Sequence, residues 1–311
     1  YMDEISVGGE MSGALVDWAY GLLEQEFGDQ LQVTKEQVQT FVEESTVKDF
    51  VADKVAGIVE DFYTGESETT ITKEEIVELI QENNAKGEPT VMIVPYGPLG
   101  PYARLVYLIN KHRVSLKNCW FINMDEYLDE KGQYLPKSDP LSFRGGMDRI
   151  FYGLVDEELL MPEEQRIFPE PGNEGYIWEL IQKFGKLDMC WGGVGITGHI
   201  AFNEPPEPGE VCTDEEFLER PTRVLQLARE TKTINAFMNC GADLDGIPDL
   251  CITVGMKEIN FARKIRMLMP RDWNAAMLRK ALHGPVSCKV PVSLFQNHPD
   301  AKIFAIALAA H

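Results

Sequence analysis

The chain has 311 residues and a formal net charge of −21, so it is long enough for one large α/β domain or two smaller ones, while nucleic acid is disfavoured as the main partner. Its apolar stretches are far shorter than the roughly 20 residues of a membrane-spanning helix, and the negative charge opposes an anionic bilayer, so we expect no membrane partner. The six cysteines form no CxxC pair, which indicates reduced thiols and a cytoplasmic protein.

The N-terminal part of the chain is acidic and has the apolar spacing of amphipathic helices. This spacing occurs at 14–27, 47–63 and 73–84. No residues with evident chemistry stand out there. We therefore predict a helical segment over 1–89, which packs on the main domain or makes the contact of a homo-oligomer.

From Thr90 onward, short apolar runs alternate with helical patterns. The predicted strands cover 90–97, 118–127, 187–195, 248–256, 265–270 and 302–310. The predicted helices cover 103–112, 178–185 and 274–284. Near-continuous apolar strands that alternate with helices are typical of a parallel sheet covered on both faces. We expect such a domain over 90–311, with its ligand at the carboxyl ends of the strands.

The predicted strand 187–195 ends in a Gly-rich turn that leads to a histidine. Gly193, Gly195 and Gly198 could let main-chain N–H groups approach an anion, but the residues after Gly198 open no helix and we predict no dinucleotide cofactor. His199 is either a core or capping histidine or a proton-transfer group, and its strand-end position favours the second. Glu204 could hold one ring nitrogen and leave the other to the substrate.

Two acidic residues, Asp125 and Glu126, end the predicted strand 118–127. Carboxylates are unfavourable in a core and common in a cleft, so one of them is a candidate general base. The alternative is that Asp125 caps the following turn. Together with His199 and Glu204, these acids indicate a site that moves protons on a small polar molecule without a metal or a nucleotide.

Two motifs resemble the glucosamine-6-phosphate deaminase/isomerase family, whose members convert the amino sugar phosphate to fructose 6-phosphate and ammonia. They are NMDEY at 123–127 and GGVGITGHIAFNEP at 192–205. The similarity runs with gaps from Thr90 to the last strand and includes PLGPY, PTRVLQLARETK, PDLCITVGM and QNHPDAKIF. The HIAFNEP run separates the chain from the related 6-phosphogluconolactonases, which share only the Gly-rich turn.

The resemblance implies a three-layer α/β sandwich, a sugar phosphate as substrate, and a mechanism without metal or cofactor. By it, His199, oriented by Glu204, opens the pyranose ring by proton transfer to and from the ring oxygen. Asp125 then moves a proton between C2 and C1, with release of ammonia.

Several positions depart from the family pattern. Thr197 stands where the family has an aspartate two residues before the histidine, and a threonine cannot supply the negative charge that stabilises an imidazolium. The loop 96–100 lacks the Ser-Thr pair of the family's phosphate loop and contains a proline without an N–H. Lys232 replaces an arginine, and Arg271 is the nearest substitute for a lysine that falls near Asn274. The predicted substrate and phosphate contacts are Gly97, Gly100, Gly193, Gly195, Thr197, Gly198, Arg223, Lys232 and Arg271.

These departures leave two other classes of function open. One is a non-catalytic sugar-binding or regulatory paralogue, and the other is a sugar-phosphate lactonase in which His199 activates water. Retention of Asp125, His199 and Glu204 together favours the deaminase/isomerase. The acidic stretch 205–221 is either a lid or an insertion.

Overall fold

The computed structural model describes residues 69–306 and Ala309 of the chain. The helices predicted at 14–27 and 47–63 lie outside the described residues. The last helix predicted for the N-terminal segment is present as α4 (Thr69–Lys86). Its Ile76, Val77 and Ile80 are buried in the same apolar cluster as β1 and α5. In the described part of the chain, no helix is long and apolar enough to cross a membrane.

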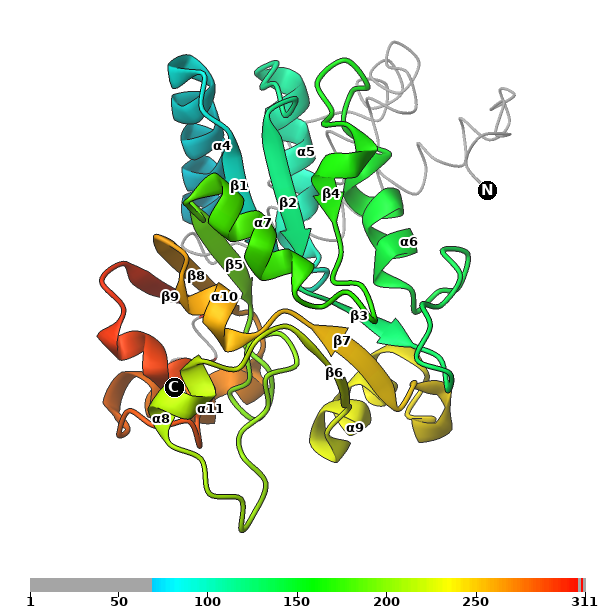
Figure 1. The fold of residues 1–311 in the computed structure, drawn as a ribbon, viewed down its shortest axis with the longest axis vertical. Helices are drawn as coiled ribbons and strands as arrows, with labels where there is room; N and C mark the ends of the chain where they lie inside the picture. Colours follow the sequence, from blue (N-terminus) through cyan, green and yellow to red (C-terminus); the bar gives the residue numbers. More distant parts are fainter. Residues whose placement is uncertain (1–68, 307–308, 310–311) are drawn as a thin grey trace, which may run out of the picture. The chain divides into compact units, whose positions relative to one another are not determined.

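Six parallel strands form the central sheet, in the order β4-β2-β1-β5-β8-β9 (Figure 1). The strands are β1 (Thr90–Val94), β2 (Cys119–Asn123), β4 (Arg166–Ile167), β5 (Met189–Gly193), β8 (Lys264–Met269) and β9 (Ala301–Ala305). After β1 the chain builds one half of the sheet outward through β2 and β4. It then returns to β5, beside β1, and builds the other half. The strand order therefore reverses between β1 and β5, where ligands bind in open sheets of this kind.

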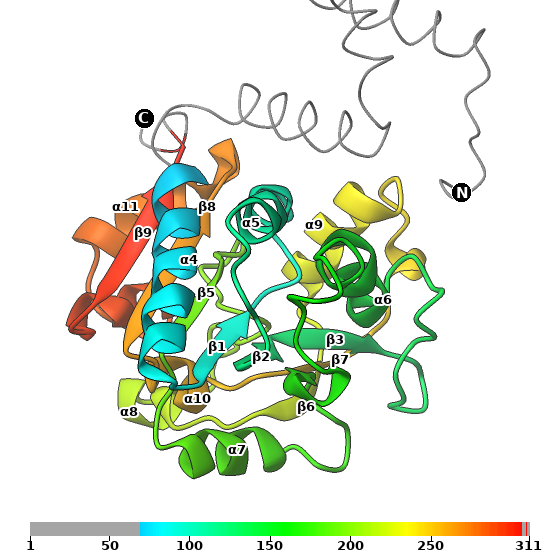
Figure 2. The ribbon, with the colours of Figure 1, turned by 90° about the horizontal axis from the view of Figure 1, so that it is seen from above.

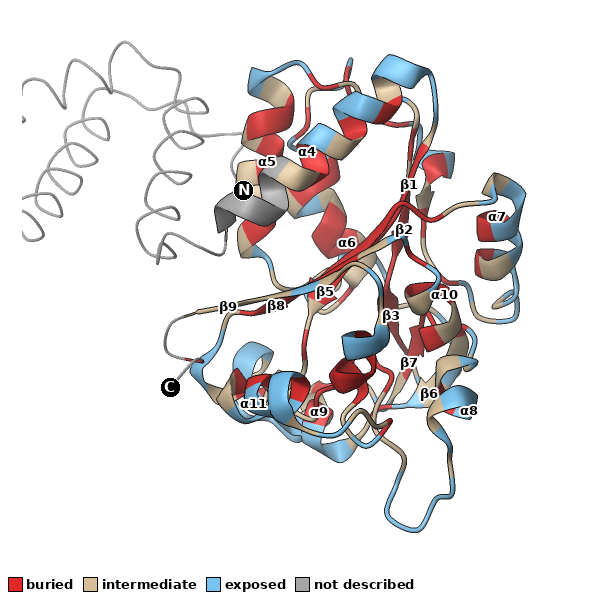
Figure 3. Ribbon diagram, turned by 90° about the vertical axis from the view of Figure 1, so that its left-hand side faces the viewer, coloured by how far each residue is buried: buried red, intermediate tan, exposed pale blue. Residues whose placement is uncertain are grey.

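Helices cover both faces of this sheet, which confirms the predicted three-layer α/β sandwich. Successive strand residues point to opposite faces, so that Val91 and Ile93 join one apolar cluster while Met92 and Val94 join the other. One face packs on α4, α5 (Gly100–Lys111) and α6 (Phe143–Met147), which continues as a π-helical turn over Asp148–Tyr152. The other packs on α7 (Tyr176–Phe184), α8 (Asp214–Leu218), α10 (Met256–Asn260) and α11 (Ala275–His283) (Figure 2). The central strands are buried between these layers (Figure 3).

A second, antiparallel sheet adjoins the carboxyl ends of the parallel strands. It has the order β3-β7-β6, with β3 (Asp125–Leu128), β7 (Leu250–Thr253) and β6 (Arg223–Gln226), and α9 (Arg229–Asn239) packs on it. The single strand predicted over 118–127 is thus two strands, which separate at Met124. The Met124 N–H donates to Val94 in β1, while its carbonyl accepts from Val254 after β7, so the chain passes from one sheet to the other there.

Candidate active site

The candidate site lies at the reversal point between β1 and β5. The loop after β1 and the end of β5 approach each other closely there, since a Cβ on Gly193 would lie 3.2 Å from the Cδ of Pro98. The predicted phosphate contacts Gly97 and Gly100 are in the same loop, and Gly100 is the first residue of α5. A helix N-terminus at this edge of a sheet favours an anion.

The Gly-rich turn after β5 folds tightly around the His199 ring. Gly198 has a φ of +86°, and its N–H donates to the Gly195 carbonyl at 3.0 Å. The Gly195 N–H in turn donates to the His199 carbonyl at 3.0 Å. A Cβ on Gly195 would lie only 1.9 Å from His199 Nε2, so only a glycine leaves room for the imidazole in this position. Gly195 therefore positions the histidine.

His199 is 8% exposed, and one of its ring nitrogens lies close to three side chains. Nδ1 lies 2.7 Å from Oε1 of Glu204, 3.1 Å from the Thr197 hydroxyl and 3.2 Å from the Thr231 hydroxyl. A carboxylate at Nδ1 places a proton on that nitrogen. No hydrogen bond among the described residues uses Nε2, which leaves this nitrogen to act on a substrate.

Glu204 is held in the charged form that this arrangement needs. Burial acts to raise the pKa of Glu204, but the His199 imidazole and two hydroxyl groups outweigh burial, and its pKa is lowered. Thr197 donates to Oε2 at 2.6 Å and Thr231 donates to Oε1 at 2.5 Å. Thr197 thus contributes through Glu204, which supplies the negative charge beside the histidine. Sequence analysis missed Thr231, although it lies within the PTRVLQLARETK run.

Replacing Thr231 by Val is expected to lower the kcat of the reaction at this site about tenfold. Valine keeps the shape of threonine, but the charged Glu204 carboxylate loses the hydrogen bond that the Thr231 hydroxyl donates. The measurement is steady-state turnover beside a thermal melting curve. Thr231→Ser retains the hydroxyl and should restore most of the activity. Equal turnover by Thr231→Val and the wild type would contradict a role for this hydroxyl.

Asp125 begins β3 and has the environment of a group that exchanges protons near neutral pH. It is 9% exposed, and no described residue donates a hydrogen bond to its carboxylate. Burial, and then the charge of Glu126, raise the pKa of Asp125 to about 8. A carboxyl group with such a pKa can take up a proton and give it back.

Glu126 is turned away from Asp125, because successive strand residues point to opposite sides. It is fully buried, and its carboxylate accepts hydrogen bonds from the N–H groups of Tyr127, Phe143 and Arg144 and from the Ser142 hydroxyl. Burial raises the pKa of Glu126, and these hydrogen bonds act against that rise. Both carboxylate oxygens of Glu126 thus accept hydrogen bonds from the start of α6.

Thr253 on β7 connects Asp125 with the loop that carries His199. Asp125 pairs with Thr253 across the antiparallel sheet, and the Thr253 hydroxyl accepts from the N–H of Phe202, three residues after His199. Both carboxylates also act on one thiol, since burial and then the charges of Asp125 and Glu204 raise the pKa of Cys251. Asp125 and the His199–Glu204 pair therefore share one local environment.

The three predicted cationic contacts have different surroundings. Arg271 is exposed and lies two residues after the end of β8. In the same segment the buried Asn274 side chain donates to the Val194 carbonyl and ties it to the Gly-rich turn. Lys232 instead pairs with Asp249 at 2.5 Å. Arg223 donates to the Asn203 side chain at 2.8 Å and so supports the HIAFNEP loop.

A hollow of about 490 Å³ lies between the Gly-rich turn and α9. It is lined by Ile196, which precedes Thr197, and by residues of α9 that include Arg229 and Phe237. Arg229 is a basic residue near the site that sequence analysis did not select.

No family model matches the chain. It is 33% identical over 218 residues to the glucosamine-6-phosphate deaminase of Aeromonas hydrophila, an alignment that covers 68% of this chain and 75% of that protein. The Cronobacter sakazakii protein of the same name is 33% identical over 238 residues, which are 73% of this chain and 82% of that protein.

Solved structures agree on the fold. A monomeric glucosamine-6-phosphate deaminase superimposes with a TM-score of 0.66 at 24% identity, over 78% of this chain and 94% of that one. The 6-phosphogluconolactonase of Trypanosoma cruzi superimposes with a TM-score of 0.53 at 17% identity, over 78% and 92% of the two chains. The identity and coverage of the two curated relatives exceed what a shared fold alone would give, and the chain belongs to the glucosamine-6-phosphate deaminase family.

Proposed function

We propose that the chain converts glucosamine 6-phosphate and water to fructose 6-phosphate and ammonia. The observation that carries the proposal is the His199 imidazole, fixed through Nδ1 by Glu204 and two threonine hydroxyls, in the same environment as the buried Asp125. Membership of the family supports this substrate.

The first chemical step assigned to these residues is ring opening. Nε2 of His199 takes the proton of the anomeric hydroxyl and delivers it to the ring oxygen, as the C1–O bond of the ring breaks. The imidazolium that forms on the way is stabilised by Glu204, which lies 2.7 Å from Nδ1. The aspartate that the family has in place of Thr197 is therefore not required for this charge.

The second step assigned to the site is isomerisation. Asp125 removes the proton from C2 of the open aldehyde and returns it to C1, while a proton passes from the amino group to O1, so that C1 becomes a hydroxymethyl carbon and C2 an imine carbon. Water then adds to this imine, and ammonia leaves as the C2 ketone forms. Glu126 is proposed to position Asp125 and the start of α6, since it accepts one hydrogen bond from Tyr127 in β3 and three from the start of α6.

For the phosphate, we propose the start of α5 as the binding point. Its loop exposes Gly97, and a Cβ there would meet nothing within 4 Å, so the backbone is open to a ligand. Arg271 and Arg229 are the proposed cations, since Lys232 is paired with Asp249.

The pH dependence of kcat/KM follows from Asp125, whose ionised form is the base. Because burial raises the pKa of this carboxyl to about 8, the ionised fraction of the free enzyme falls about tenfold for each pH unit below that value. We expect kcat/KM to rise with pH from about 6 and to level off above about 8. An NMR titration of the substrate amine separates its own ionisation from that of the enzyme. A kcat/KM that is flat across this range would contradict the role of Asp125.

The experiment that tests the function is coupled ammonia release from glucosamine 6-phosphate, run beside unphosphorylated glucosamine and 6-phosphogluconolactone. We expect release from the phosphate ester, reduced about 100-fold or more in His199→Ala. No release by folded protein from either sugar would overturn the proposal. Saturable binding without turnover would then support a sugar-binding paralogue, and lactone hydrolysis would support a lactonase.

A further inference from the structure

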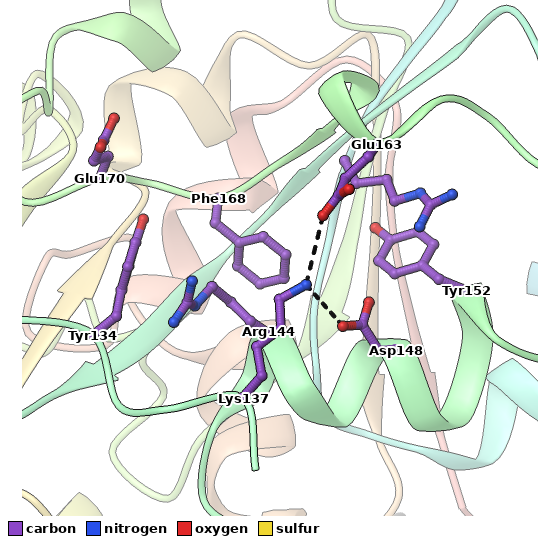
Figure 4. Close-up of a pocket in the computed structure, with 9 residues that line it drawn as sticks. Tyr134, Lys137, Arg144, Asp148, Tyr152, Glu163, Phe168 and Glu170 are labelled. Atoms are coloured by element: carbon purple, nitrogen blue, oxygen red, sulfur yellow. Dashed lines mark hydrogen bonds and ion pairs between the residues drawn. The ribbon is translucent and has the colours of Figure 1, made fainter. Parts of the chain in front are cut away.

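A second, polar cavity of about 260 Å³ lies beside α6 (Figure 4). Its lining includes Arg144, whose main-chain N–H donates to Glu126. Three aromatic rings, those of Tyr134, Tyr152 and Phe168, form part of its wall. Basic and acidic side chains form the rest. None of the residues that line it takes part in the proposed reaction.

Two arginines of this cavity stack on aromatic rings, and several of their N–H groups have no acceptor among the described residues. The Arg144 guanidinium stacks on Tyr134, 4.0 Å from the ring centre, and donates through Nη2 to the Leu135 carbonyl. Arg166 lies 5.0 Å from the ring centre of Tyr152 and also donates one hydrogen bond from Nη2, to a main-chain carbonyl. Each guanidinium has five N–H groups, and in both arginines the buried Nε has no hydrogen-bond partner among the described residues.

The carboxylates of the cavity do not satisfy these guanidinium groups. Asp148 and Glu163 both pair with Lys137, at 2.8 Å and 3.8 Å (Figure 4). Glu170 is exposed at the rim. The carboxylate nearest to Arg144 is that of Glu126, 3.6 Å from Nε and occupied by the start of α6. Within the described part of the chain, positive donors without acceptors therefore remain at this cavity.

We propose that this cavity, the oxyanion pocket, binds a small carboxylate or phosphate compound at Arg144 and Arg166, and that the ligand acts on the start of α6 through Arg144. Planar guanidinium groups fixed against aromatic rings are well suited to bidentate recognition of either oxyanion. The volume admits a compound of the size of a small dicarboxylate. Binding here does not depend on the proposed reaction.

The connection to the catalytic carboxylates runs through one residue. Arg144 lines the pocket with its guanidinium, while its main-chain N–H donates to Glu126 Oε2 at 2.8 Å. Glu126 is also the neighbour whose charge acts on Asp125. A ligand that fixes the Arg144 side chain thus restrains the helix start that holds Glu126.

Isothermal titration calorimetry on the full chain tests the binding, with malonate and with inorganic phosphate as probes. We expect saturable binding of at least one probe, weakened at least tenfold in Arg166→Gln, because a charge-assisted contact is lost. Arg263→Gln removes an exposed arginine that does not line the pocket and should change affinity less than twofold. The preferred probe tells a carboxylate ligand from a phosphate ligand. No saturable binding, or equal binding by Arg166→Gln and wild type, would overturn the proposal.

A second variant should increase the affinity for the probe, and it changes an exposed residue, so it should not affect folding. Glu170→Gln removes an exposed carboxylate at the rim and should tighten binding of the same probe about threefold, since a nearby like charge is removed. Unchanged or weaker binding by this variant would count against an oxyanion as the ligand.

Hydrogen exchange followed by mass spectrometry tests the effect on α6. Saturating probe should slow amide exchange at 142–147 in wild type and leave it unchanged in Arg166→Gln. Unchanged exchange in wild type would overturn the connection to α6. Absence of ammonia release counts against the proposed function alone, because neither calorimetry nor exchange requires turnover.

Discussion

Replacing Asp125 by Asn is expected to lower kcat for ammonia release about 10³-fold, because the amide keeps the shape of the side chain but cannot accept the C2 proton. The fold should tolerate this change, since no described residue donates a hydrogen bond to the Asp125 carboxylate. The measurement is steady-state turnover with the wild type and the variant at matched pH. Binding of the substrate should change much less than turnover.

A second prediction for Asp125→Asn concerns stability. The pKa of Asp125 is raised from 3.8 to about 8 by burial, so the folded chain keeps a proton that the unfolded chain loses, and the wild type loses stability as the pH rises between these two values. The amide of Asp125→Asn has no such ionisation, so the free energy of unfolding of the variant should fall less over this range. Asp245→Asn, at an exposed position, is the matched control and should behave as the wild type in both assays. Full turnover by Asp125→Asn would remove Asp125 from the mechanism.

Replacing Gly195 by Ala is expected to lower kcat about 100-fold by displacing the histidine. The new methyl group would lie 1.9 Å from Nε2 and 2.1 Å from Cε1 of His199, distances that no packing allows. The ring must turn away, and its 2.7 Å contact with Glu204 breaks or shifts. Misplacement of a proton-transfer group by about 1 Å is sufficient for a loss of this size.

Gly175→Ala is the matched control for this glycine. Gly175 precedes α7 with a φ of −63°, and a Cβ there would meet nothing within 4 Å. It should keep full turnover and thermal stability. A crystal structure of Gly195→Ala would locate the displaced ring. If Gly195→Ala retained activity within about threefold of wild type, Nε2 could not be the working nitrogen in the observed ring position.

Much of the architecture could be read from local patterns. Buried parallel strands carry continuous apolar runs, so the strands that became β1, β2, β5, β8 and β9 were predictable, and the same pattern directed the search for a site to their carboxyl ends. The close spacing of His199 and Glu204 within one glycine-rich turn made their pairing predictable too. That 118–127 leaves the sheet at Met124 was not predictable, because the strand pattern continues unbroken through that residue and the exit depends on hydrogen bonds to Val94 and Val254.

The sequence by itself determined the class of fold and the residues of the histidine turn, because the first follows from local apolar patterns and the second from residues close together in the chain. Only the tertiary structure decided which hydrogen-bond and charge partners the site residues have. Thr231 reaches Glu204 from α9, and Lys232, next to it, turns to Asp249 instead. Glu126 pairs with the start of α6 rather than with the cleft. Such partners are distant in sequence, and only long-range packing brings their charges and hydrogen bonds together.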